Sequence, residues 1–273
     1  MSTLPRLHPV RRGSRVPLAD RDAAPPEDAP PDEEIEERLE TLHDRLGKLQ
    51  RVFYADGRYA LLIVLQGRDA SGKDGTIRHV CGAFNPQGCH VTSFRAPTAD
   101  ELAHDFLWRI HAAIPARGVI GVFNRSHYED VLAVRVHGLV PRKEWSMRYD
   151  RINEFERTLA QSGVVIRKFL LHVSRDEQRR RLLDRIEDPK KNWKFRSRDL
   201  DERAKWNHYT RAYRDALSRC SLPAAPWYVV PADDKKLRNY LVARELVRTL
   251  EGLGLRYPRP DPAVRRYAKF LAR

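Results

Sequence analysis

The chain has 273 residues, enough for one sizeable α/β domain with appendages. Its 51 Lys and Arg outnumber its 37 Asp and Glu, and the formal net charge of +14 favours a polyanionic partner: nucleic acid, an anionic membrane or a phosphate polymer. It has no run of 18 apolar residues and no secretory pattern, and its three cysteines lack metal-ligand spacing. We therefore expect a cytoplasmic protein with reduced thiols and no membrane partner.

The first segment, residues 1–32, is rich in Pro, Arg, Asp and Ala and has little apolar periodicity. The pairs Pro25-Pro26 and Pro30-Pro31 interrupt any helix, so we expect a disordered or surface-wrapped arm. A helix is predicted from residue 32 to about residue 54, because apolar residues recur there at spacings of three and four. That helix is suited to packing on the core or on a second subunit.

A phosphate-binding loop is predicted at residues 67–73. Apolar residues 60–65 indicate a buried strand, Gly67-Arg68-Asp69-Ala70-Ser71-Gly72-Lys73 follows, and residues 74–83 read as a helix. This is the G-x-x-x-x-G-K pattern between a strand and a helix, where it binds phosphate. Gly67 and Gly72 let the backbone turn and direct its N–H groups inward, and Lys73 adds a charge for phosphate oxygens.

Two residues of this loop differ from the usual nucleotide-binding pattern. Asp74 stands where Ser or Thr normally helps to hold Mg²⁺, and Thr76 comes two residues late. Asp69 would repel phosphates unless a metal ion lies between them, so we interpret it as a metal-positioning residue. The alternative is a Gly-rich turn that matches the pattern by chance.

A second polar segment follows a predicted strand. Residues 90–94 are predicted as a strand, a helix should run from Thr98 or Asp100 to about residue 114, and residues 118–123 form the next buried strand. Polar residues 124–130 then occupy the carboxyl end, where open α/β sheets bind ligands. Asn124 stands where a metal-orienting Asp is expected. Either Asn124 orients a metal-bound water, or Glu129 or Asp130 supplies the negative charge that the missing Asp would carry. Arg125 is placed to bind a phosphate.

A basic segment with aromatic residues follows the third core strand. A helix at residues 143–161, a strand at 164–173 and a helix capped by Ser174 and Glu177 lead to residues 187–198. That stretch carries Lys190, Lys191 and Lys194 with Trp193 and Phe195, and it suits a phosphate-rich ligand. We predict a lid at about residues 185–205 that closes over the site, with a solvated charged loop as the alternative.

The remaining elements complete an alternating pattern. We predict a helix from Asp199 or Asp201 to about residue 219, a strand at residues 225–230 and a closing helix at residues 235–253, with residues 256–273 as a loosely held tail. Alternation of strands and helices predicts a parallel sheet with right-handed crossovers and helices on both faces. The main domain should span residues 33–255.

Three motifs together resemble the family-2 polyphosphate kinases. They are residues 67–76, residues 123–132 (Phe-Asn-Arg-Ser-His-Tyr-Glu-Asp-Val-Leu) and residues 189–195 (Pro-Lys-Lys-Asn-Trp-Lys-Phe). The likeness covers about residues 39–253. It implies a thymidylate-kinase-like P-loop fold with a helical lid. It also implies reversible, Mg²⁺-dependent phosphoryl transfer from inorganic polyphosphate to nucleoside mono- or diphosphates, AMP and ADP and possibly GMP and GDP.

The resemblance also assigns residues to the site. Catalytic roles fall to Asp69, Lys73 and Arg125. Many members have Asp-Arg-Ser where this chain has Asn124-Arg125-Ser126. The form with Asn, continued here as His-Tyr-Glu, resembles the subgroup that acts on both mono- and diphosphates. The expected metal ligands are therefore Asp69, Asn124 and Glu129. The expected phosphate-binding residues are Gly67, Ala70, Ser71, Gly72, Asp74, Gly75, Thr76, Arg78, Lys190, Lys191 and Lys194.

Two other functions are alternatives to a polyphosphate kinase. An ATP-dependent nucleotide kinase is disfavoured because Ser or Thr is missing after Lys73 and because Asp69 is acidic. A nucleic-acid-binding protein is favoured by charge alone, since no helix-turn-helix, zinc or aromatic-sheet signature is present. We therefore expect polyphosphate and nucleotides as partners and no nucleic acid. The apolar stripe at residues 35–49 makes a homodimer or homotetramer plausible.

Overall fold

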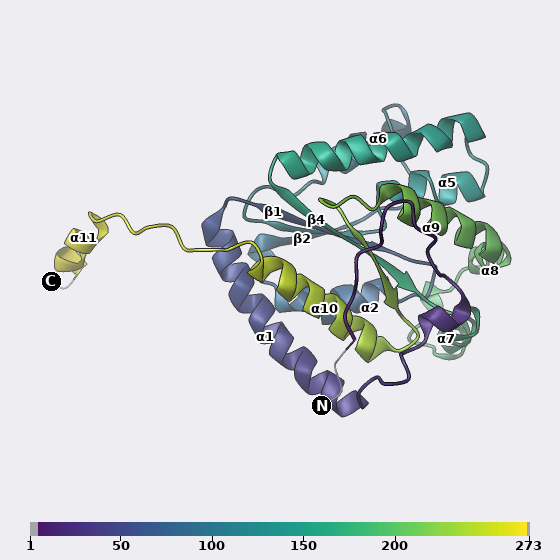
Figure 1. Cartoon of the computed structure of the whole chain (residues 1–273), viewed down its shortest axis with the longest axis horizontal. Coiled ribbons are helices and arrows are strands. Elements are labelled where there is room, and N and C mark those ends of the chain that lie inside the picture. The colour runs from purple at the N-terminus through teal and green to yellow at the C-terminus, as the bar shows by residue number, and fades with distance from the viewer. Residues whose placement is uncertain (1–4, 272–273) are drawn as a thin grey trace.

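The protein is built around a five-stranded parallel sheet with helices on both faces (Figure 1). The computed structural model describes residues 5–271, so residues 1–4 of the expected arm and 272–273 of the expected tail lie outside the described residues. The strand order is β2-β3-β1-β4-β5, and every pair is parallel. The strands are β1 (Ala60–Gln66), β2 (Cys89–Ser93), β3 (Ile120–Asn124), β4 (Val164–His172) and β5 (Trp227–Pro231). The predicted α/β fold class is confirmed.

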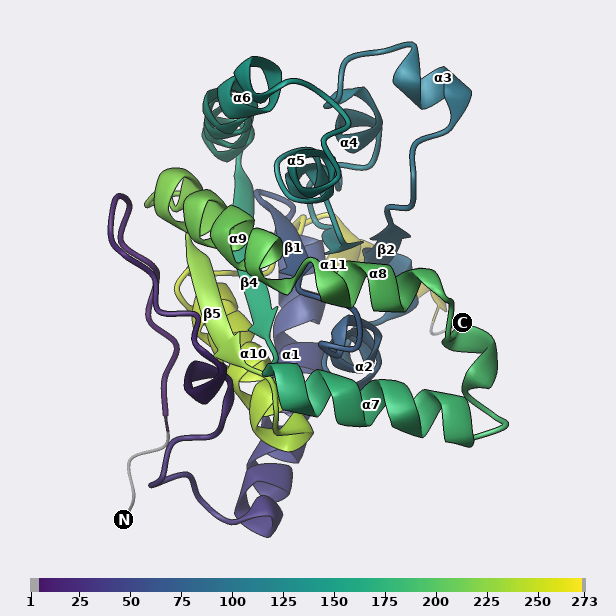
Figure 2. The same ribbon diagram turned by 90° about the vertical axis from the view of Figure 1, so that its right-hand side faces the viewer.

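The helices differ widely in length. The long ones are α1 (Asp32–Asp56), α6 (Arg142–Gln161), α7 (Arg175–Glu187), α9 (Trp206–Cys220) and α10 (Lys235–Glu251). The short ones are α2 (Lys73–His79), α3 (Ala99–Leu102), α4 (Trp108–Ala112), α5 (Ala133–Val136), α8 (Arg198–Ala204) and α11 (Val264–Leu271). Helices α7 and α8 project from the end of the sheet at which the strands finish (Figure 2).

Strand β1 divides the hydrophobic core into two halves. All seven of its residues are buried, and successive side chains point to opposite faces of the sheet. Leu62 and Val64 pack in the half that α6 and α9 cover, whereas Leu61 and Ile63 pack in the half that α1 and α10 cover. Because both faces are covered, the strand is a continuous apolar run, as is typical of parallel sheets. The loop that follows β1 therefore starts from a strand that is buried on both faces.

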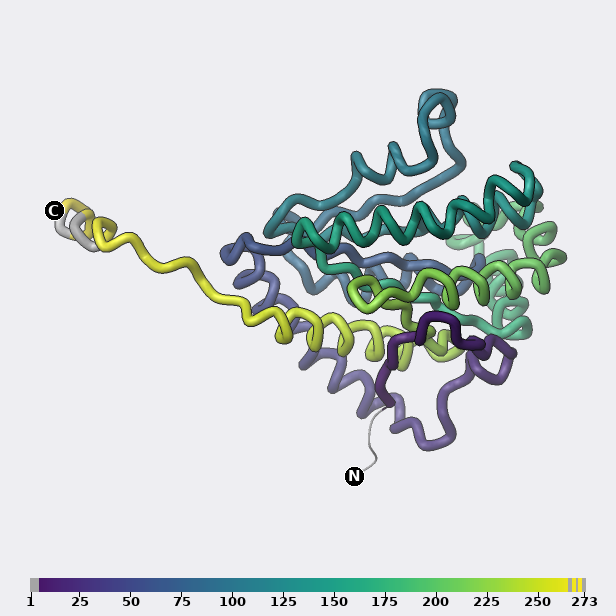
Figure 3. Tube along the Cα trace, turned by 45° about the horizontal axis from the view of Figure 1, so that its top comes forward, coloured from purple at the N-terminus to yellow at the C-terminus, as the bar shows by residue number. Residues whose placement is uncertain are grey.

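The N-terminal arm lies against the outer edge of β5 (Figure 2), and Figure 3 shows the same purple segment on the surface of the molecule. Pro9 forms an antiparallel bridge with Tyr228, and the Val10 N–H donates to the Trp227 carbonyl at 2.8 Å. Further along the arm, Val16 and Leu18 are buried in the core. The arm is thus held by backbone pairing and by apolar contacts.

Three predicted helices were wrong in extent. The helix after the phosphate loop ends at His79, because the chain tightens there into a separate 3₁₀ turn that buries Val80 and Cys81. The helix expected to reach residue 114 is two short helices, α3 and α4. Asp105 separates them, since its carboxylate accepts from the Leu107 N–H at 2.9 Å and caps a new turn.

The helix expected up to about residue 219 is also divided, into α8 and α9 at Lys205. The backbone of Lys205 is not helical, with ψ of 17°, and its Nζ donates to Nδ1 of His137 at 2.8 Å.

Two other helices, α5 and α11, were not predicted. Within residues 5–271, none of the helices combines the length and the apolar character needed to cross a membrane.

Candidate active site

The phosphate loop lies at the carboxyl end of β1, between the ends of β3 and β4. Three of its residues have positive φ: Gly67 at 156°, Ala70 at 61° and Gly72 at 100°. Gly67 also packs closely, because a Cβ there would lie 2.5 Å from Ser71 Oγ and 2.7 Å from the Leu171 carbonyl oxygen. Both glycines are therefore needed for the tight turn. The buried hydroxyl of Ser71 has no hydrogen-bond partner in the described structure.

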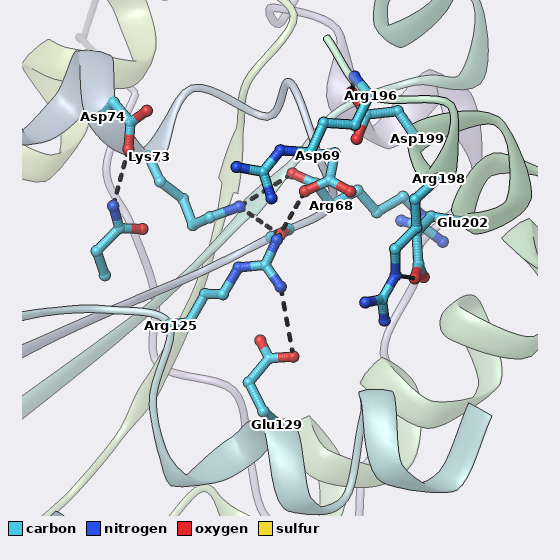
Figure 4. A network of polar contacts seen from close by, with 12 residues as sticks. Arg68, Asp69, Lys73, Asp74, Arg125, Glu129, Arg196, Arg198, Asp199 and Glu202 are labelled. Atoms are coloured by element: carbon cyan, nitrogen blue, oxygen red, sulfur yellow. Dashed lines mark hydrogen bonds and ion pairs between the residues drawn. The ribbon is translucent and has the colours of Figure 1, made fainter. Parts of the chain in front are cut away.

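Lys73 is held by carbonyl groups of its own loop. Its Nζ donates to the carbonyl oxygens of Gly67 at 2.7 Å and Arg68 at 3.1 Å (Figure 4). The side chain is buried, and this burial, followed by repulsion from Arg125, lowers its pKa to about 8. A lysine so placed is a poorly solvated cation that an anion in the loop would stabilise.

Arg125 joins the two predicted acidic ligands. Its Nη2 lies 2.8 Å from Asp69 Oδ1, and its Nη1 lies 3.8 Å from Glu129 Oε2. Its backbone has φ of 64°, which is uncommon for a residue other than glycine. The Glu129 carboxylate, and then Asp69, raises the Arg125 pKa and keeps the guanidinium charged. The structure thus brings Asp69, Arg125 and Glu129 together from two loops (Figure 4).

Asn124 points its amide nitrogen at the phosphate-loop helix. Asn124 Nδ2 donates to Asp74 Oδ1 at 2.8 Å, so these two predicted residues contact each other rather than Asp69. Asp130 points elsewhere, because its carboxylate pairs with Arg148 of α6 at 2.7 Å. Burial raises the Asp130 pKa to about 6. Of the two acidic candidates that follow Asn124, Glu129 is therefore the one beside Arg125.

Helix α7 supports the outside of the phosphate loop with two residues that sequence reasoning missed. Gln178 Nε2 donates to the Asp69 carbonyl at 3.0 Å. Arg181 Nη1 donates to the Ala70 carbonyl at 2.9 Å, and its Nη2 donates to the Ala232 carbonyl at 2.6 Å. The capping box predicted this helix, but no local signal showed which face meets the loop.

Arg68, a loop residue for which the sequence predicted no role, connects the loop to α9. Its guanidinium lies 3.9 Å above the Trp206 ring, and its Nη2 donates to Thr210 Oγ1 at 2.6 Å. The side chain is 8% exposed, and burial lowers its pKa to about 10. The loop is therefore coupled to the point at which α8 meets α9.

The predicted lid, residues 185–205, approaches the loop at Asp199 of α8, which was not among the predicted site residues. Asp199 lies close enough to Asp69 for the Asp69 charge, together with burial, to raise the Asp199 pKa (Figure 4). The three predicted lysines are exposed, and the contacts described for Lys191 and Lys194 are with Asp188 and Trp193 of their own segment. Arg78 is also exposed, in the last turn of α2.

The donor set near the loop suits a magnesium ion that substrate helps to hold. Within residues 5–271 no group of three or more His, Cys, Asp or Glu side chains is arranged to hold a metal ion. Mg²⁺ commonly binds through one or two carboxylates together with substrate phosphates and water. Asp69 and Glu129, both within reach of Arg125, are carboxylates of that kind. The residues present therefore suit Mg²⁺ but would supply only part of its coordination shell.

The comparison with protein families gives a match over most of the chain. The family model described as "Polyphosphate kinase 2 (PPK2)" matches residues 30–255. The crystal structure of polyphosphate kinase 2 from Arthrobacter aurescens TC1 superposes with a TM-score of 0.90 at 41% identity, covering 96% of this chain and 95% of that one.

Two curated relatives match at higher identity. The "AMP/ADP-polyphosphate phosphotransferase" of Meiothermus ruber is 53% identical over 227 residues, which is 83% of this chain and 85% of that protein. The "ADP-polyphosphate phosphotransferase" of Rhodopseudomonas palustris is 48% identical over 246 residues, which is 86% of this chain and 85% of that protein.

Proposed function

The chain belongs to the polyphosphate kinase 2 family, and from this premise we propose that it transfers a phosphoryl group from inorganic polyphosphate to nucleoside mono- or diphosphates, reversibly. AMP and ADP are the proposed acceptors, with GMP and GDP as further candidates. The observation that carries the proposal is the phosphate loop in the centre of the sheet, with Asp69 ion-paired to Arg125 at 2.8 Å.

Each proposed catalytic residue has a role that its position supports. Lys73 and the loop backbone would bind phosphates next to the reacting one, and Arg125 would turn from Asp69 towards the charge that develops during transfer. Asp69 and Glu129 would help to hold Mg²⁺, which neutralises phosphate charge when bound. Positioning and electrostatics suffice for phosphoryl transfer, so no covalent nucleophile is needed.

The wider organisation is also part of the proposal. Residues 33–255 would form the phosphotransferase unit, and residues 185–205 would act as its lid, bringing Lys190, Lys191 and Lys194 towards polyphosphate on closure. Arg78 would contact polyphosphate beyond the loop. We propose that the enzyme works as a homodimer or homotetramer in the cytoplasm.

A coupled assay tests the proposal. Purified protein, Mg²⁺ and long-chain polyphosphate are mixed with AMP, ADP, GMP or GDP in turn, and the nucleotides are separated by chromatography. We expect ADP and ATP from AMP. ATP from ADP alone would restrict the acceptors to diphosphates. An ATP-dependent kinase would be favoured if product formed only when ATP replaced polyphosphate as the donor. A nucleic-acid-binding protein would be favoured if the chain bound DNA and polyphosphate equally well and formed no product.

The binding of polyphosphate should weaken as the pH rises through about 8. Lys73 has a pKa of about 8, lowered by burial and by Arg125, while Asp69, Glu129 and Asp74 raise it in part. Below this pKa the ammonium group is charged and attracts phosphate. Above it the free enzyme must take up a proton to bind, so affinity should fall by up to about tenfold per pH unit. Isothermal titration calorimetry with polyphosphate at pH 7.0, 8.0 and 9.0 measures this.

The matched variant for this pH series is Lys73→Arg. An arginine stays protonated throughout the range, so its affinity should change much less with pH. A wild-type affinity that is constant from pH 7.0 to 9.0 would contradict the assignment of this titration to Lys73.

A further inference from the structure

Arg238 of α10 lies directly beneath the phosphate loop. Its side chain is 2% exposed and occupies the space beside Gly72 of the loop and Gly75 of α2. An ideal Cβ on Gly72 would lie 2.0 Å from Arg238 Nη1, and one on Gly75 would lie 3.2 Å from Nη2. Helices α10 and α2 pack against each other, which places this guanidinium against the backbone of the loop and of the first turn of α2.

The charge of Arg238 has no carboxylate partner among residues 5–271. Its Nε and Nη2 donate to the side-chain oxygen of Asn239 at 3.2 and 2.9 Å, and that amide carries no charge. Arg181, the other buried arginine that supports the loop, is paired instead with Glu177 at 2.6 Å. A buried charge without a counter-charge lowers the stability of the folded protein. Burial, together with repulsion from Arg181, lowers the Arg238 pKa to about 10, while the more distant Asp234 carboxylate opposes that shift, so the group remains charged at neutral pH.

The loop carries two more buried cations in the same situation. Arg68 stacks on Trp206 and donates to neutral oxygens, and Lys73 donates to loop carbonyls. No ion pair with a carboxylate is found for either of them within the described residues. Three buried cations therefore surround one short loop without a carboxylate at ion-pair distance, although Asp69, Glu129 and Asp74 act on Lys73 from further away. An anion in the loop would stabilise this arrangement.

We propose that Arg238 is a positioning residue that supports the phosphate loop from beneath and leaves positive charge there for bound polyphosphate to neutralise. The inference rests on the proposed function for the identity of the anion. Arg238 contacts the backbone side of the loop, so it would act on phosphate binding and not on the transfer step itself. The competing interpretation is that Arg238 only fills space under Gly72.

The two interpretations differ in the effect of Arg238→Met, which keeps most of the volume and removes the charge. If Arg238 is a filler, polyphosphate affinity should be unchanged. If its charge supports binding, the dissociation constant for polyphosphate should rise about tenfold, because attraction across a few ångströms of protein is only partly screened. In the second case, the melting temperature without polyphosphate should be equal to or above that of the wild type, because an unpaired buried charge has been removed.

The experiment measures long-chain polyphosphate binding by calorimetry, melting temperature with and without polyphosphate, and steady-state kinetics. For Arg238→Met we expect a higher KM for polyphosphate with kcat within about twofold, since kcat reports interactions made in the transition state. Arg238→Lys keeps the charge and should bind polyphosphate nearly as well as the wild type. Arg248→Met, on the same helix but paired with Glu245 at 2.7 Å and exposed, is the matched control and should leave binding unchanged.

Three outcomes would overturn the inference. They are an unchanged polyphosphate affinity in Arg238→Met, an equal loss in Arg238→Lys, and a loss in Arg238→Met explained by partial unfolding, seen as a lower melting temperature without polyphosphate. Failure of the proposed function looks different, because the wild type itself would then show no polyphosphate binding.

Discussion

Replacing Lys73 by methionine is expected to lower the rate of nucleotide phosphorylation from polyphosphate at least about 100-fold, the usual scale for losing one group that stabilises developing charge. The ammonium group is already inside the loop, where it donates to the carbonyls of Gly67 and Arg68. Methionine keeps the chain length but offers no charge to phosphate oxygens. Initial rates at saturating polyphosphate, Mg²⁺ and AMP or ADP measure the loss.

The controls separate this chemical effect from damage to the fold. Asp69→Ala should show a loss of the same size, because it removes a carboxylate that is proposed to help hold Mg²⁺. Lys48→Met, at an exposed position of α1, should leave the rate unchanged. Near-normal turnover in Lys73→Met, with an unchanged melting temperature, would show that the proposed mechanism is wrong.

The second large effect is on stability. Lys168 of β4 is completely buried, and its Nζ contacts the Glu156 carboxylate, Tyr128 Oη at 2.8 Å and the Cys220 carbonyl at 2.7 Å. Burial lowers its pKa, with Glu156 opposing that shift. Lys168→Met leaves the Glu156 carboxylate buried without its cation, so the free energy of unfolding should fall by about 3–5 kcal/mol. Urea denaturation followed by tryptophan fluorescence measures the change.

Two further variants test the physical reason. The double variant Lys168→Met with Glu156→Leu removes both charges and should recover most of the lost stability, since the cost arises from the unpaired partner. Arg151→Met breaks an exposed pair with Glu154 and should change the unfolding free energy by less than about 1 kcal/mol. A loss below about 1 kcal/mol in Lys168→Met would contradict the expected dependence of Glu156 on Lys168.

The features that the sequence predicted well are those with a local signal. The apolar run that became β1 and the loop from Gly67 to Lys73 carry their structure in adjacent residues, and the family inferred from three motifs is confirmed. The parallel sheet with helices on both faces also follows from local information, because strands and helices alternate along the chain.

The features that were missed depend on contacts between distant segments. Arg181 and Arg238 support the loop from α7 and α10, more than 100 residues away in the chain, and their spacing reveals nothing of that contact. The same holds for Asn124, whose amide donates to Asp74 instead of facing Asp69. The break between α8 and α9 belongs here too, because Lys205 meets His137 of a different segment. The periodicity of apolar residues shows which face of a helix is buried, but it does not show which segment that face packs against.

The position of the N-terminal arm bears on how the chain avoids aggregation while it is being made. Strand β5 is the last strand to leave the ribosome, and a newly exposed edge strand can pair with another molecule. Its outer edge is taken by residues 9 and 10, which were synthesised more than 200 residues earlier. A backbone partner for Trp227 and Tyr228 has therefore already been synthesised when β5 emerges.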